Sequence, residues 1–236
     1  PTPTPTPTPS PTPESPPVQD NLLENPGFEG GTTRETTYWT ADGGPYHTEF
    51  GEITTPSGWV TWWREGFPCS GTADYNAGRP EVKVIDASFF GDPERWRSGQ
   101  KATLLFTFWR CHEMGLYQEV PVEVGRQYAL QAYGHAWYSQ CSDAPHSPPL
   151  EADCETPLTW AHDTLRVGVD PDGGVDYDEV VWSGPVEIYG RYGDPVRLEG
   201  VTARGPTVTV WLYARATHPL KHNDVYWDDV TLEVTP

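Results

Sequence analysis

Proline, glycine and aromatic residues most constrain what this chain can fold into. Its 236 residues include 26 Pro and 23 Gly, which disfavour helices, and 11 Trp and 12 Tyr, which favour strands. Short alternating runs, separated by turn-forming residues, begin at Asn21, and no helical pattern exceeds two turns. The sequence therefore predicts an all-β fold, a sandwich of antiparallel strands. The expected strands lie at residues 101–110, 116–122, 127–138, 165–170, 180–182, 208–213 and 225–234.

Two parts of the chain differ from this pattern. Residues 1–17 alternate Pro and Thr with a little Ser, a composition that favours an extended polyproline path and cannot bury a core. We expect a Pro/Thr linker at residues 1–18, either O-glycosylated or simply disordered, and one β-sandwich domain at residues 19–236. Two further stretches, 30–57 and 139–159, are expected to be loop insertions. The abrupt start within the linker suggests a piece of a longer secreted polypeptide, whose other domains would be its partners.

The charge and hydropathy of the chain exclude several partners. With 15 basic and 34 acidic side chains the net charge is −19, which disfavours binding to nucleic acid or to an anionic membrane surface. No apolar run approaches the roughly 20 residues that a membrane helix needs, so membrane insertion is not expected.

Four cysteines in a chain of secreted character predict disulfide bonds. We favour Cys69 with Cys111 and Cys141 with Cys154, although four cysteines allow three pairings. A zinc site is the less favoured alternative, because the sequence has no Cys-x-x-Cys spacing.

Three motifs resemble one family. Residues 21–29 (NLLENPGFE), 115–128 (GLYQEVPVEVGRQY) and 225–232 (VYWDDVTL) are similar to the opening, middle and last strands of jelly-roll carbohydrate-binding modules of the galactose-binding-like kind, the group of families 4, 9, 16 and 22. The resemblance covers most of residues 21–234. It implies a two-sheet jelly roll that binds a polysaccharide or glycan without catalysis.

The resemblance also implies a structural calcium ion between the first loop and the last strand. Glu29, Asp228 and Asp229 would supply carboxylates from the two ends of the domain, which suits the oxygen preference of Ca²⁺. The alternative is that these acids are solvated strand-end residues. A second acidic stretch, residues 170–179 (DPDGGVDYDE), has Gly174 at the third ligand position of an EF-hand loop and no flanking helices. We therefore favour a turn there.

One strand carries polar and aromatic side chains on the face opposite its core residues. In residues 128–138, the alternation that starts at Tyr128 predicts a core face. The other face carries Gln131, Tyr133, His135 and Trp137, and rings beside planar polar groups suit sugar rings and their hydroxyls. We expect this face to be open and to bind the ligand.

Three other clusters are candidates for the rim of that face. The residues concerned are Trp62 and Trp63; Trp109, Arg110 and His112; and His222, Asn223 and Asp224. The competing interpretation of each tryptophan is a core residue.

The sequence thus predicts a non-catalytic carbohydrate-binding module that is secreted or displayed at a cell surface. Catalysis is disfavoured, because only the abundance of carboxylates supports it. The alternative is a structural β-sandwich subunit of an adhesin, sheath or filament, which would self-associate and cover its aromatic face with protein.

Overall fold

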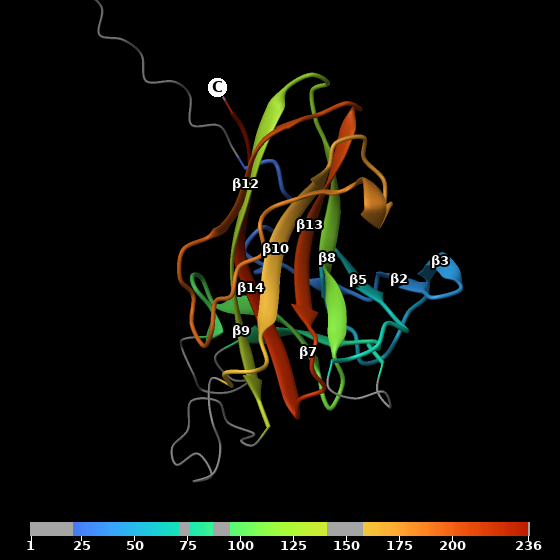
Figure 1. The fold of residues 1–236 in the computed structure, drawn as a ribbon. Helices are drawn as coiled ribbons and strands as arrows, with labels where there is room; N and C mark the ends of the chain where they lie inside the picture. Colours follow the sequence, from blue (N-terminus) through green and yellow to red (C-terminus); the bar gives the residue numbers. More distant parts are fainter. Residues whose placement is uncertain (1–20, 71–75, 87–94, 141–157, 236) are drawn as a thin grey trace, which may run out of the picture.

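Two packed β-sheets form the body of the protein, as seen in the computed structural model (Figure 1). The structure describes residues 21–70, 76–86, 95–140 and 158–235. The predicted antiparallel β-sandwich is confirmed. The described residues include the 3-10 turn η2 (Tyr177–Glu179), and they contain no helix long and apolar enough to cross a membrane.

From β7 onward the strands follow the predicted runs closely, except for β12, which the sequence analysis did not predict. Their bounds are β1 Thr32–Thr33, β2 Thr36–Thr40, β3 Gly43–His47, β4 Thr55–Pro56, β5 Val60–Arg64, β6 Glu81–Asp86, β7 Lys101–Thr107, β8 His112–Pro121, β9 Gln127–Ser139, β10 Asp163–Asp170, β11 Val181–Trp182, β12 Val196–Thr202, β13 Thr207–Ala216 and β14 His222–Val234.

One sheet has seven strands in the order β11-β10-β13-β8-β5-β2-β3, and the other has five in the order β12-β9-β14-β7-β6. Neighbours are antiparallel except β2 and β5, which run parallel. Strands β1 and β4 form a separate two-stranded ladder.

The main core lies between the sheets, because strand alternation sends every second side chain inward. In β13 the inward residues are Val208, Val210, Leu212 and Ala214, and all four are buried. On β9, Tyr128, Leu130 and Ala132 face the same core, as the alternation predicts.

The expectation of a loop insertion at residues 30–57 is wrong. This stretch contains β1 to β4, and β2 extends the seven-stranded sheet by pairing with β5, with Thr37 opposite Trp62. The many Thr and Gly residues made the alternation of these short strands hard to recognise. The predicted linker at 1–18 and most of the predicted insertion at 139–159 lie outside the described residues.

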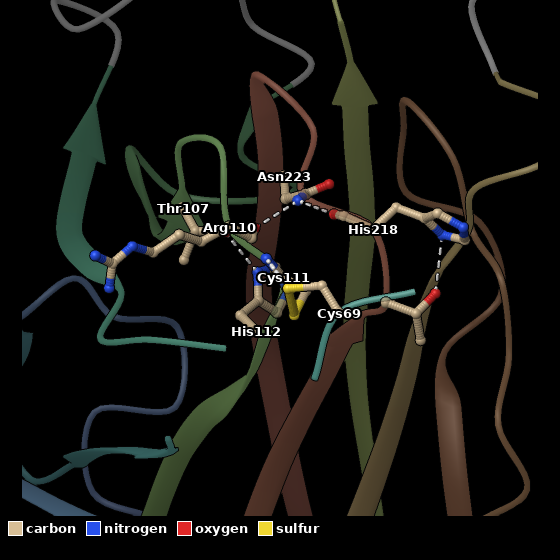
Figure 2. The surroundings of a disulfide bond; sticks show 8 residues. Cys69, Thr107, Arg110, Cys111, His112, His218 and Asn223 are labelled. Atoms are coloured by element: carbon tan, nitrogen blue, oxygen red, sulfur yellow. Dashed lines mark hydrogen bonds between the residues drawn. A yellow bond between two sulfur atoms is a disulfide. The ribbon is translucent and has the colours of Figure 1, made fainter. Parts of the chain in front are cut away.

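The disulfide between Cys69 and Cys111 is confirmed (Figure 2). It joins the segment after β5 to the turn between β7 and β8, 42 residues further on. Beside it, the Asn223 side-chain amide donates hydrogen bonds to the backbone oxygens of Arg110 and His218, both at 2.9 Å. Cys141 and Cys154 lie outside the described residues.

Candidate functional site

The expected open face of β9 is closed in this structure, and that prediction is corrected. His135 and Trp137 do point away from the main core, but their exposed fractions are 0% and 2%. Both pack in a second apolar layer over the outer face of the five-stranded sheet. The ring of His135 stacks on Tyr226 with centroids 4.6 Å apart, and Trp137 packs with Phe106 and Leu104.

Segments outside the strands form the cover of this face. Tyr192, which precedes β12, meets the His135 ring edge-on at 4.6 Å and donates a hydrogen bond to the backbone oxygen of Arg95. The Arg97 guanidinium lies 3.5 Å from the centroid of the half-buried Tyr133 ring. Gln131 is also half-buried. Neither His135 nor Trp137 offers a ring face to a ligand in this arrangement.

Trp62 and Trp63 are fully buried on opposite faces of β5 and do not form a loop wall. Trp63 points into the main core, where it stacks on Tyr38 at 4.9 Å with an interplanar angle of 4°. Trp62 points outward and donates from Nε1 to the backbone oxygen of Leu212 at 3.1 Å. The competing interpretation as core residues is therefore the better one for both.

The predicted cluster at the end of β14 is also internal. His222, Asn223 and Asp224 are buried, and Asn223 has the structural role described above. His112 is fully buried beside the Thr107 hydroxyl, and burial lowers its pKa to about 3, so the imidazole is neutral. Burial raises the pKa of Asp224 to about 7.

Trp109 and Arg110 are the predicted ligand residues that remain well exposed. Trp109 lies in the turn after β7 with 51% of its surface accessible. Arg110 lines a recess of about 550 Å³ together with Asp42, Glu65 and Asn76. The structure thus places Arg110, but not the predicted β9 face, at an open concave surface.

The proposed calcium position fails a test of its ligand set. Glu29 accepts hydrogen bonds through Oε1 from the backbone N–H groups of Gln100 and Lys101, at 2.6 and 2.9 Å. The Lys101 ammonium donates to the backbone oxygens of Glu29 and Gly30 at 3.0 and 3.3 Å. A protein cation therefore occupies the carbonyl oxygens that a metal ion would need.

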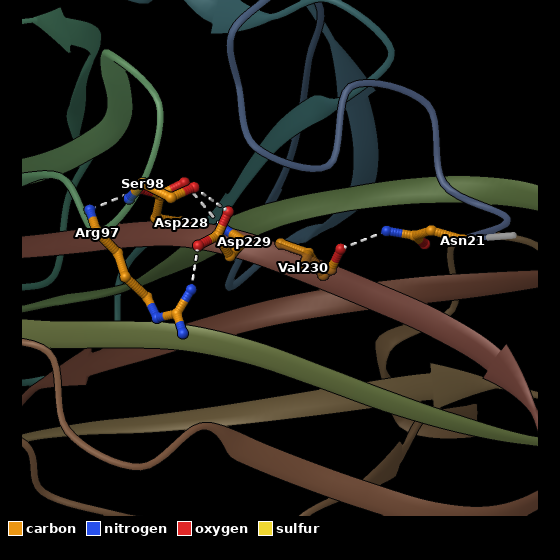
Figure 3. A network of polar contacts seen from close by, with 6 residues as sticks. All are labelled: Asn21, Arg97, Ser98, Asp228, Asp229 and Val230. Carbon is orange, nitrogen blue, oxygen red and sulfur yellow. Dashed lines mark hydrogen bonds and ion pairs between the residues drawn. The ribbon is translucent and has the colours of Figure 1, made fainter. Parts of the chain in front are cut away.

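The two aspartates of the last strand are engaged in the same way (Figure 3). Asp228 accepts from the backbone N–H groups of Arg97 and Ser98 at 2.7 and 3.2 Å, and Asp229 pairs with the Arg97 guanidinium. Burial is the main cause that raises the pKa of Asp228 to about 7. The residues present do not fit calcium here, because Arg97 and backbone amides already satisfy these carboxylates and the Lys101 ammonium occupies the adjacent backbone oxygens.

Another acidic group in the described part of the chain does bring three carboxylates together. Oxygens of Asp170, Asp172 and Glu179 lie within 4.8 Å of one another. These residues flank the turn expected at residues 170–179, and that turn is present between β10 and η2.

The outer face of the seven-stranded sheet carries a second aromatic cluster. Trp62, Trp211, Tyr117 and Tyr213 form its buried part, and the partly buried rings of Trp39, Tyr177 and Trp182 pack against it. The rings of Trp62 and Trp211 meet edge-on at 5.3 Å, and Trp39 lies 6.2 Å from Trp211. The alternation of β8 and β13 produces this cluster, because their other faces fill the main core.

Glu113 connects the polar groups at the margin of this cluster. Its carboxylate accepts hydrogen bonds from the hydroxyls of Tyr177 and Tyr213 at 2.9 and 3.2 Å and lies 3.4 Å from the Arg64 guanidinium. Burial, together with the adjacent Glu113 carboxylate, raises the pKa of Tyr177 to about 12. The phenol therefore stays protonated and can act as the hydrogen-bond donor to Glu113. The same guanidinium lies 4.7 Å from the centroid of the Tyr177 ring, which fixes both side chains.

A recess of about 350 Å³ opens beside this network, and we call it the Trp39 recess. Its lining includes Trp39, Arg64, Phe67, Asp176, Tyr177 and Asp178. It shares Thr40, Ala41, Glu65 and Gly66 with the recess that Arg110 lines, so the two adjoin. Rings beside a guanidinium and carboxylates can stack on the C–H faces of a ligand and bond its hydroxyls.

Our sequence analysis missed Trp39 and Tyr177 as candidate ligand residues. Trp39 lies in the stretch that we expected to be a loop. Tyr177 lies in the stretch where the Pro-Asp-Gly-Gly sequence predicted only a turn. A usable signal was the pair Tyr38-Trp39, since adjacent rings in a strand point to opposite faces and Tyr38 belongs to the core.

No protein-family model matches the sequence, and no curated protein matches it significantly. Among solved structures the chain is similar to TmCBM61, a structure in complex with β-1,4-galactotriose, at 16% identity and a TM-score of 0.51 over 92% of this chain and 99% of that one. Two further matches have lower TM-scores. One is the xylan-binding CBM22-1 domain of Xyn10C from Paenibacillus barcinonensis, at 16% identity and a TM-score of 0.42 over 92% of this chain and 95% of that one. The other is the Stig cyclase Fisc from Fischerella sp. TAU, at 16% identity and a TM-score of 0.47 over 92% of this chain and 97% of that one. The match to TmCBM61 confirms the predicted fold, a two-sheet jelly-roll sandwich.

Proposed function

We propose that this domain binds carbohydrate without catalysis, and that the ligand lies in the Trp39 recess. The observation that carries the proposal is the lining of that recess: partly exposed rings of Trp39 and Tyr177 stand beside the Arg64 guanidinium and the carboxylates of Asp176 and Asp178. Sugars present apolar C–H faces next to hydroxyls, so they require both kinds of group.

The preorganisation of the recess supports the same proposal. Glu113 holds Arg64 and Tyr177. Trp39 packs against the buried rings of Trp62 and Trp211. Side chains that are fixed before binding lose little conformational entropy when the ligand arrives. We propose that Arg110 extends the site through the adjoining recess, which suits a chain of several sugar units.

The context of the module is part of this proposal. The Cys69–Cys111 disulfide supports an extracellular or cell-surface protein, because such bonds persist in oxidising compartments. Partners would be a polysaccharide or glycan and other domains of the same polypeptide, and single-site affinity would be micromolar to millimolar, about −4 to −8 kcal/mol.

The test is calorimetric titration with soluble galactan, xylan and β-glucan, after a polysaccharide array has selected the ligand. We expect Trp39→Ala and Tyr177→Ala each to weaken binding tenfold or more, about 1.4 kcal/mol. Trp160→Ala is the matched control, since Trp160 is 49% exposed and lines neither recess.

Trp109→Ala separates this proposal from the site predicted by sequence. If that variant alone loses binding, the ligand lies at the turn after β7. Unchanged binding in both Trp39→Ala and Tyr177→Ala, or no polysaccharide ligand for the folded protein, would overturn the proposal.

A further inference from the structure

We propose that Asp170, Asp172 and Glu179 form a binding site for Ca²⁺ between the end of β10 and η2. Their ligand oxygens lie within 4.8 Å of one another. Ca²⁺ binds oxygens at 2.3–2.6 Å, so ligands on opposite sides of one ion are about 4.8 Å apart. The three carboxylates can therefore contact a single ion.

An independent observation points to a ligand at this cluster. Asp170 is fully buried, and its Oδ2 atom has no hydrogen-bond partner among the described residues. Its Oδ1 atom accepts from the backbone N–H of Asp172 at 2.9 Å. A buried carboxylate oxygen without a donor is costly, and a bound cation removes that cost.

The neighbouring strand has a second buried oxygen of this kind. Thr209 lies directly opposite Asp170 in the β10–β13 register, so both side chains extend from the same face. The Thr209 hydroxyl is fully buried and also has no partner among the described residues. Asp172 and Glu179 are exposed, which leaves room for water ligands to complete the shell of six to eight oxygens.

The charge balance suits a divalent ion. Arg204 forms an ion pair with Asp172, and both side chains are largely exposed. Three carboxylates and one guanidinium leave a net charge of about −2 at this place, which one Ca²⁺ would neutralise. Arg204 therefore competes with the ion for Asp172.

Binding of the ion would fix the loop that carries Tyr177. An ion held by Asp170 and Glu179 connects the last residue of β10 to the last residue of η2, and Tyr177 lies between them at the wall of the Trp39 recess. The proposed cation site stands on its own contacts and does not depend on sugar binding.

Calorimetric titration of the EDTA-stripped full chain with CaCl₂ tests the site. We expect one ion per chain with a Kd of about 10⁻⁴–10⁻³ M, the range of extracellular calcium modules. Glu179→Gln, which changes an exposed side chain, should weaken binding tenfold or more, and Asp170→Asn should abolish it.

Three further variants sharpen the result. Arg204→Gln should tighten binding severalfold, because it removes the competing cation. Asp194→Asn, an exposed carboxylate away from the cluster, should have no effect. Glu29→Gln tests the position that the family resemblance implies, and it should leave the titration unchanged.

Absence of heat or of a melting shift at about 10 mM CaCl₂, well above that Kd range, would overturn the inference. So would wild-type affinity in Glu179→Gln, or loss of binding in Glu29→Gln. Unchanged or weaker binding in Arg204→Gln would place the ion elsewhere.

Discussion

The outer faces of the two sheets carry the same kinds of side chain but end in different surfaces. On the five-stranded sheet, His135, Trp137 and Tyr226 are buried beneath Tyr192 and its neighbours. On the seven-stranded sheet, Trp62 and Trp211 are equally buried, yet the cluster continues to Trp39 at the edge of an open recess.

This difference arises from the connecting segments and not from the strands. The segments before β7 and before β12 bring Arg95, Arg97 and Tyr192 over the five-stranded sheet. On the seven-stranded sheet, the loop after β10 brings only Tyr177 and the residues around it. A row of rings along one face of a strand therefore indicates a second apolar layer, and the connections decide whether that layer stays accessible.

The largest effect should come from opening the closed face. Trp137→Ala removes a fully packed ring, and we expect the free energy of unfolding to fall by about 3–5 kcal/mol. Chemical denaturation measures the loss, with Trp160→Ala as an exposed control. A change below about 1 kcal/mol would show that this face is not a packed layer in solution.

The pH dependence of stability tests the same layer. Burial raises the pKa of Asp224 to about 7, and burial followed by the nearby Asp224 raises the pKa of Asp163 well above its usual value. The folded state thus holds protons that the unfolded chain releases near pH 4. The contribution of these two protonated carboxyl groups to stability should be fully present below about pH 4. It should be lost as the pH rises to about 7, which lowers the free energy of unfolding by a few kcal/mol in total.

Melting temperatures at pH 5 and pH 8 measure this effect. Asp224→Asn cannot ionise and should reduce the difference between the two values. A wild-type melting temperature that rises over this interval, or an unchanged difference in the variant, would contradict a buried protonated carboxyl.

A smaller loss of stability is expected where Arg97 covers the half-buried Tyr133 on the five-stranded sheet. Arg97→Gln removes the cation from the Tyr133 ring and from Asp229, and these contacts together contribute about 1–2 kcal/mol to stability. We expect the uncovered Tyr133 to leave sugar binding unchanged, as measured by titration. If the variant binds sugar more tightly, the comparison fails and the β9 face is a ligand site that Arg97 blocks.

The smallest effect should occur at the open face. Tyr177→Phe deletes one hydrogen bond to Glu113 but keeps the ring, so we expect a stability loss of about 1 kcal/mol and sugar binding within about threefold of the wild type. A tenfold loss of binding would show that the hydroxyl, and not the ring, contacts the ligand.

Sequence patterns predicted the parts of this fold that depend on local alternation. The two faces of β9 were assigned correctly, with Tyr128 and Leu130 inside and His135 outside, and the Cys69–Cys111 pairing was also correct. The cover of the outer face was not predictable in this way, because Tyr192 lies 57 residues after His135 in a segment without alternation.

The calcium prediction was not confirmed, for a similar reason. The carboxylates of Glu29, Asp228 and Asp229 were expected to bind one ion. Spacing alone did not reveal that Arg97 would pair with Asp229 or that the Lys101 ammonium would bond to the Glu29 backbone oxygen. Carboxylates that lie close together therefore predict a metal site only when nearby cations and N–H groups leave enough of their oxygens free to bind the ion.

The contacts between the two ends of the domain also have a mechanical consequence. The Asn21 side chain bonds to both Val230 and Leu232, the Leu22 N–H donates to the Leu232 oxygen, and the Val230 N–H donates to the Pro26 oxygen. Because the first segment runs antiparallel to β14, a force pulling on both ends would load these hydrogen bonds one after another, as in a zipper. Opening would begin at Asn21 and would next meet the two hydrogen bonds between the Glu24 backbone and the Gln118 side chain, at 2.7 and 2.9 Å, before it reached Pro26.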